Sequence, residues 1–121
     1  MAFKEGIDLQ FADREIIRAM GDEAYKAVEA AAQATLADAN TMVPVRTGAL
    51  KASGYYKMLP GDRPAAVVGY DAPYARIIHY NLAIKLRNGQ HLWVQEAIKR
   101  TGIRMLRQAV KAFTDKMQGG Q

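Results

Sequence analysis

The spacing of apolar residues changes at Pro44, and this change constrains the fold more than any other feature of the 121-residue chain. Before Pro44, apolar side chains recur at three- and four-residue steps, which lays one stripe along an amphipathic helix. We expect this long helix to begin with Asp13 as its N-cap, to continue to about Ala39, and to be weakened at Gly21. The stripe consists of Ile16, Ile17, Met20, Ala24, Ala27, Val28, Ala31 and Ala34.

After Pro44 the apolar residues alternate, as they do in half-buried strands. The segments 49–59 and 65–70 read as two strands joined by the turn residues 60–64, so we predict a β-hairpin. A loop centred on Asp62 sets a register that keeps like residues on one face. The pairs are then Tyr56 with Val68, Met58 with Ala66, and Gly54 with Tyr70. In this register the ring of Tyr70 covers Gly54.

The remaining segments complete one predicted domain over residues 1–121. Residues 3–11 read as an extended lead-in, 72–80 as a turn followed by a short helical or irregular apolar segment, and 81–91 as an exposed loop. A second long helix is expected from Leu92 to about Met117, with Gly102 as an interior weak point. The expected fold class is therefore α+β, with a long N-terminal helix, an antiparallel hairpin-based sheet, and a long C-terminal helix packed on it.

The chain contains no cysteine, which excludes disulfides and thiolate chemistry. No run of 18 or more apolar residues is present, so a membrane span is not expected. The N-terminal residues lack the charged and apolar regions of a signal peptide, so we expect the protein to begin in the cytoplasm.

Charge is divided unevenly along the chain. Residues 1–42 hold four Lys/Arg and eight Asp/Glu, a net charge of −4, whereas residues 43–121 hold thirteen and four, a net charge of +9. The expected C-terminal helix carries a basic face. It could be solvated, meet the acidic part of a neighbouring copy head to tail, or bind nucleic acid. This face consists of Lys99, Arg100, Arg104, Arg107 and Lys111.

Few residues suggest catalysis or ligand binding. Asp71 and His79 are near each other in sequence and form the one candidate acid–base pair, which would suit a small hydrolase. Isolated residues beside apolar segments more often have structural roles. The two histidines lack the spacing of a zinc site, and no glycine-rich nucleotide-binding motif occurs. We therefore expect no catalytic residues, no metal and no cofactor.

Residues 43–53 read Val-Pro-Val-Arg-Thr-Gly-Ala-Leu-Lys-Ala-Ser. This segment resembles the signature of phage head–tail joining proteins, also described as tail-completion, neck or minor capsid proteins of tailed double-stranded DNA phages. The following order is similar too: a β-hairpin, a Tyr-Ala segment, a loop, and an aromatic entry into a long C-terminal helix. The residues that carry the resemblance are Pro44, Arg46, Thr47, Gly48, Leu50, Ser53, Tyr74, Ala75 and His79.

The resemblance implies a structural protein of the virion. Its subunits would form a homo-oligomeric ring of six or twelve copies, contact portal, neck or tail proteins, and let double-stranded DNA pass without reading its sequence. Closed rings arise from such head-to-tail contacts when the rotation between neighbours divides the circle. We expect the hairpin tip and the loop to make assembly contacts. The residues concerned are Gly61, Asp62, Arg63, Lys85, Arg87 and Asn88.

Overall fold

The computed structural model describes residues 2–44, 48–86 and 88–119, and it confirms an α+β fold. Within these residues, the strands form one three-stranded antiparallel sheet in the order β1-β3-β2. The elements are β1 (Phe3–Asp8), α1 (Arg14–Met20), α2 (Asp22–Ala39), α3 (Ala49–Ala52), β2 (Gly54–Met58), β3 (Ala65–Tyr70), α4 (Ala75–Tyr80), α5 (Trp93–Ala97), η1 (Ile98–Gly102) and α6 (Ile103–Gly119).

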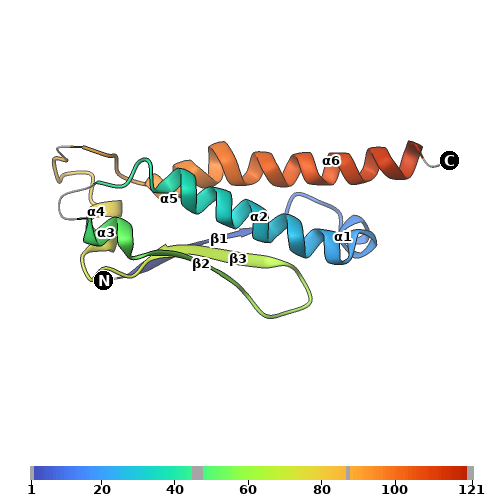
Figure 1. The fold of residues 1–121 in the computed structure, drawn as a ribbon, viewed down its shortest axis with the longest axis horizontal. Helices are drawn as coiled ribbons and strands as arrows, with labels where there is room; N and C mark the ends of the chain where they lie inside the picture. Colours follow the sequence, from blue (N-terminus) through green and yellow to red (C-terminus); the bar gives the residue numbers. More distant parts are fainter. Residues whose placement is uncertain (1, 45–47, 87, 120–121) are drawn as a thin grey trace.

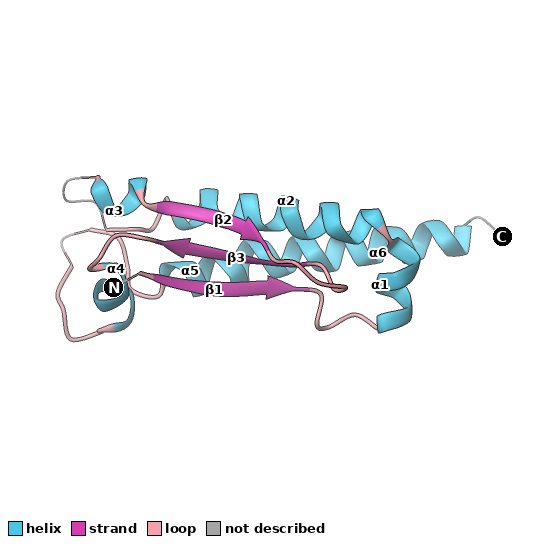
Figure 2. Cartoon of the chain, turned by 90° about the horizontal axis from the view of Figure 1, so that it is seen from below, coloured by secondary structure: helices cyan, strands magenta, loops and turns pink. Residues whose placement is uncertain are grey.

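The helices lie on one side of the sheet. Figure 1 shows α2 running along the sheet with α6 beyond it, and Figure 2 shows the strands in front of both helices. The molecule is elongated, with α3 and α4 at one end and α1 and the hairpin tip at the other. The C-terminal helix therefore packs mainly along α2, and its far end extends beyond α1 in both views.

The predicted hairpin register is confirmed. β2 and β3 pair Gly54 with Tyr70, Tyr56 with Val68, and Met58 with Ala66. A Cβ added to Gly54 would lie 2.8 Å from Cε2 of Tyr70, so the ring covers this glycine as expected. In the next pair the glycine is on β3 and the tyrosine on β2. A Cβ on Gly69 would lie 2.9 Å from Cζ of Tyr55. Each tyrosine thus covers the glycine opposite it.

The predicted N-terminal helix is shorter than expected, because Gly21 divides it into α1 and α2. Gly21 has φ 54° and ψ −123°, a backbone conformation that residues with a Cβ rarely adopt. The chain therefore changes direction where a helix of uniform geometry was predicted. Asp13 does occupy the N-cap position of α1, but its side chain makes no capping hydrogen bond.

The prediction that the first strand of the hairpin begins at Ala49 was wrong. Residues Ala49–Ala52 form the helical turn α3, and the strand begins only at Gly54. Gly48, with φ 84°, precedes this turn, and its carbonyl accepts a hydrogen bond from the Ala52 amide at 2.9 Å. Apolar and polar residues that alternate over only four positions fit one helical turn as well as a strand. Leu50 is buried in this turn, as it would be in a strand.

The C-terminal helix runs from Trp93 to Gly119 and includes the π-helical turn η1. Leu92, predicted as its first residue, instead precedes it with a positive φ of 56°. A Cβ on Gly102 would lie 2.5 Å from Cδ1 of Ile7 and 2.5 Å from Oγ1 of Thr35. Gly102 therefore lets the helix approach β1 and α2 more closely than any other residue would allow.

Candidate functional site

The signature segment connects α2 to the hairpin, and part of it is described. Leu50 is buried, and the hydroxyl of Ser53 donates a hydrogen bond to the Leu50 carbonyl at 2.7 Å. A Cβ on Gly89 would lie 2.6 Å from the nitrogen of Pro44, so the loop after α4 lies against Pro44. The signature residues Arg46 and Thr47 lie outside the described residues. Within the described residues, the signature thus forms a packed connection between α2 and the hairpin.

The Tyr-Ala segment leads into α4, with Tyr74 as its N-cap. The three signature residues of this segment differ in how deeply they are buried. Ala75 and His79 are fully buried, whereas Tyr74 remains 41% exposed. The ring of His79 stacks on Phe3 with a centroid distance of 4.1 Å and lies edge-on to Trp93 at 4.6 Å. This aromatic cluster, completed by Tyr70, joins β1, β3, α4 and α5.

The environment of His79 favours its neutral form. Nε2 accepts a hydrogen bond from the Val94 amide at 3.3 Å, so the neutral ring carries its proton on Nδ1. Nδ1 has no hydrogen-bond partner among the described residues. Burial, with the nearby charge of His91, lowers the pKa of His79 to about 4. Asp71, its candidate partner in an acid–base pair, is exposed instead.

His91 fixes the loop of residues 81–91, a role that the sequence did not indicate. Its Nδ1 lies 2.5 Å from the Ile78 carbonyl and its Nε2 lies 2.7 Å from the Ile84 carbonyl. Both partners are acceptors, so only the doubly protonated ring can donate to both of them. The predicted contact residues Lys85 and Asn88 are exposed on this loop, and Arg87 lies outside the described residues.

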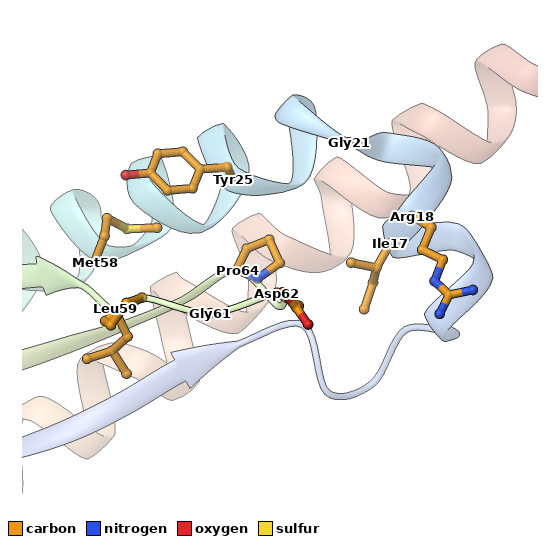
Figure 3. A pocket seen from close by; sticks show the side chains of 10 residues that line it. Ile17, Arg18, Gly21, Tyr25, Met58, Leu59, Gly61, Asp62 and Pro64 are labelled. Carbon is orange, nitrogen blue, oxygen red and sulfur yellow. The ribbon is translucent and has the colours of Figure 1, made fainter.

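The hairpin tip forms one wall of an open groove of about 690 Å³ (Figure 3). We call it the hairpin groove. Its opposite wall comes from α1 and the start of α2. Gly61 and Asp62, two predicted assembly residues, line the groove, while Arg63 is exposed beside them. Most of the lining is apolar, and its charged members are Arg18 and Asp62. The apolar side chains are Ile17, Tyr25, Met58, Leu59, Pro60 and Pro64.

The predicted basic face is largely present on the C-terminal helix. Lys99, Arg104, Arg107 and Lys111 line a second shallow groove of about 490 Å³, together with Ile103 and Gln108. Lys111 pairs with Asp115 at 2.8 Å. The guanidinium of Arg107 lies 5.4 Å from the ring centroid of Phe11. We call these four cationic side chains the basic stripe.

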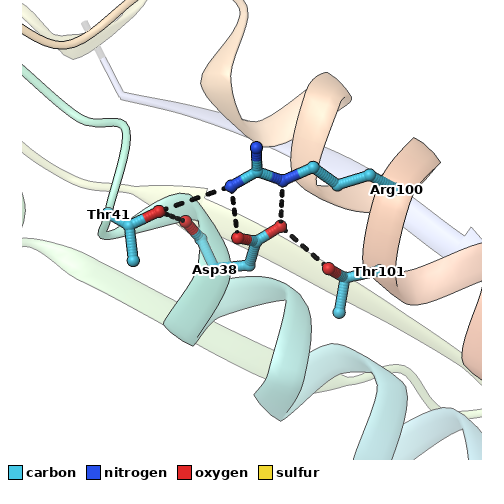
Figure 4. A network of polar contacts seen from close by, with 4 residues as sticks. All are labelled: Asp38, Thr41, Arg100 and Thr101. Carbon is cyan, nitrogen blue, oxygen red and sulfur yellow. Dashed lines mark hydrogen bonds and ion pairs between the residues drawn. The ribbon is translucent and has the colours of Figure 1, made fainter.

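Arg100, the fifth residue of the predicted basic face, turns toward α2 (Figure 4). Its Nε and Nη2 donate to the two carboxylate oxygens of Asp38 at 2.7 and 2.5 Å. Thr101 donates to the same carboxylate at 2.8 Å. The hydrogen bond from Arg100 is the main reason that the pKa of Asp38 is lowered. Arg100 therefore joins two helices of its own chain.

Three further findings concern metal ions, membranes and similarity to known proteins. The described residues contain no group of three or more His, Cys, Asp and Glu side chains that could hold a metal ion. None of the helices in the described ranges has the length and apolar character to cross a bilayer. Known protein families, curated proteins and solved structures were all compared with the chain, and none of them matches it.

Proposed function

We propose that this protein is a structural subunit of the neck of a tailed bacteriophage. In this proposal, copies of the chain form a ring that joins the head or portal to the tail and lets double-stranded DNA pass. The protein has no catalytic role. It works in the virion, after assembly in the host cytoplasm.

The observation that carries the proposal is the resemblance of residues 43–53 together with the order of the segments that follow. A helical segment ends before Pro44, and a hairpin, a Tyr-Ala helix, a loop and a long helix entered at Trp93 follow. The order of these elements agrees with what the resemblance implies for a head–tail joining protein.

The surface also suits an assembly role. Large apolar side chains are exposed at both ends of the elongated molecule. Tyr25 and Leu59 lie in the hairpin groove at one end. Tyr74, Ile77 and Leu82 lie in or beside α4 at the other end, where Ile77 is 52% and Leu82 is 67% exposed. Exposed apolar groups of this kind are typical of surfaces that contact other proteins.

The proposal is tested by examining the purified protein and the phage particles that carry its gene. Native mass spectrometry and electron microscopy should show rings of six or twelve copies, and mass spectrometry of purified particles should detect the chain. A chain that stays monomeric at every concentration and never enters particles would overturn the proposal.

A second candidate function, a small nucleic-acid-binding module, is favoured by the basic stripe. Its four cations lie along about 18 Å of helix, a length over which one DNA strand presents about five phosphates. This function predicts tight binding of the isolated chain to duplex DNA, with affinity falling steeply as salt rises. A neck subunit should bind weakly instead, because a conduit that gripped DNA would slow its passage. Fluorescence anisotropy at several salt concentrations separates the two.

A further inference from the structure

The apolar stripe of α6 continues beyond the body of the molecule. Leu106 is fully buried, Val110 and Phe113 are partly buried against the core, and Met117 is 54% exposed. These residues recur at steps of three and four, so they lie on one side of the helix. Figures 1 and 2 both show the end of α6 projecting beyond α1. The apolar stripe thus ends in Met117, whose side chain its own chain leaves exposed.

The hairpin groove presents a complementary apolar surface. Ile17 and Tyr25 line it from the helical side, and Met58 and Leu59 line it from the hairpin (Figure 3). Tyr25 is 47% and Leu59 is 37% exposed, so the groove has large apolar side chains that no described residue covers completely. Its volume of about 690 Å³ has room for several side chains.

One charge beside each surface is complementary to the other, while Arg18 also lines the groove. Lys116 is exposed next to Met117 on α6, and Asp62 is exposed at the rim of the hairpin groove. Neither side chain forms an ion pair with another described residue. An approach that buried Met117 in the groove could therefore bring Lys116 toward Asp62. Such a rim pair would contribute more to orientation than to affinity.

We propose that the end of α6 from one copy of this chain docks in the hairpin groove of a second copy. A helix is too stiff to fold its last turns back onto the same molecule, and both views show this end leading away from the body. The docked helix end would cover Tyr25 and Leu59 with Met117. The inference rests on the proposed function, because it specifies how sister copies join.

The absence of native cysteine allows a direct test. Met117→Cys and Leu59→Cys are introduced into separate preparations of the full chain, which are mixed and mildly oxidised. We expect a disulfide-linked dimer in the mixture, since the two positions meet only across the contact. The control pairs Met117→Cys with Leu82→Cys, a more exposed position beside α4 at the opposite end. Equal yields in the two mixtures, or no cross-link with Leu59→Cys, would overturn the inference.

A second pair of variants separates this contact from ring formation in general. Met117→Asp should raise the dissociation constant of self-association at least tenfold, whereas Met117→Leu should retain it. Circular dichroism should show both variants folded, because Met117 is exposed in the single chain. If rings persist unchanged in Met117→Asp, the docking contact is wrong and the neck proposal stands. If the natural chain neither self-associates nor enters particles, both are wrong.

Discussion

His79 shows how its surroundings determine the chemistry of a titratable side chain. In sequence it was a candidate for acid–base work beside Asp71. In the fold it stacks on Phe3, lies edge-on to Trp93, and accepts a hydrogen bond from the Val94 amide. With no exposed surface, its ring stabilises the junction of β1, α4 and α5 and does not reach solvent.

The low pKa of His79 predicts a pH-dependent contribution to stability. The pKa is about 4 in the folded chain and about 6.5 when unfolded, so between these values the unfolded state binds a proton that the folded state does not. Stability from this residue is complete above about pH 6.5 and is lost as the pH falls toward 4. Its loss between pH 7 and pH 5 should be about 2 kcal/mol.

The measurement compares urea unfolding of the natural chain with that of His79→Phe at pH 7 and pH 5. The aromatic replacement preserves stacking but cannot titrate, so the variant should lose about 2 kcal/mol less over this range. Both proteins share all other titrating groups. Equal losses would show that His79 titrates normally in the folded chain.

The residues also show what sequence could and could not reveal. The hairpin register was predictable, because alternation and the position of Asp62 in the turn restrict which residues can pair. The pairing of Asp38 with Arg100 was not predictable, because 62 positions separate them and each suits a solvated helix face equally well. The hairpin groove was missed for the same reason, although its members Gly61 and Asp62 were predicted as contact residues.

At the scale of elements, glycine decides where helices break and where they meet. Gly21 breaks the first predicted helix, since its positive φ separates α1 from α2. Gly102 was expected to weaken the last helix, yet it lies where that helix approaches Ile7 and Thr35 most closely. Propensity alone cannot separate these outcomes, because it does not describe how a glycine packs against other elements.

Substituting Gly102 with Ala should destabilise the fold despite the higher helix propensity of alanine. The new Cβ would meet Ile7 and Thr35 at 2.5 Å, so side chains or helices must move apart. Overpacking of this kind costs about 2 kcal/mol. Chemical denaturation measures the change, and Gly119→Ala provides a helical control because open space surrounds that position. A Gly102→Ala variant as stable as the natural chain would contradict the close packing.

Asp38 and Arg100 illustrate compensation between elements. Asp38 lies in the last turn of α2, where the helix dipole disfavours a carboxylate and no basic residue of that turn opposes it. The bidentate guanidinium of Arg100 supplies the missing positive charge from η1. The contact therefore fixes the end of α2 against the π turn of the C-terminal helix.

At the scale of the whole molecule, the stable body and the projecting end of α6 have separate roles. The aromatic cluster lies at one end of the fold, and the buried stripe of α6 ends before its last turns. Residues 115–119 are all exposed. Sequence predicted the length of this helix but not its overhang, which depends on where α1 and the hairpin end in space.

Ending the chain after Thr114 should leave the fold intact and remove self-association. The removed described residues bury little surface, so the midpoint of thermal unfolding should shift by no more than about 3 °C. Differential scanning calorimetry measures this shift, and sedimentation velocity measures assembly. A truncated chain that unfolds at a much lower temperature, or that still assembles, would contradict the separate roles of the body and the end of α6.

The π turn η1 also limits how this protein can change over evolution. Its hydrogen bonds span one more residue than those of an α-helix, between the anchor at Trp93 and the long segment α6. Deleting one residue within the turn would restore regular winding and keep the downstream residues on the same sides of the helix. A deletion in the regular helix before Leu106 would instead rotate everything downstream by about 100°. Leu106 would then leave the core, and Met117 would face away from its proposed partner. The π turn is therefore the part of this helix in which the loss of one residue is tolerable.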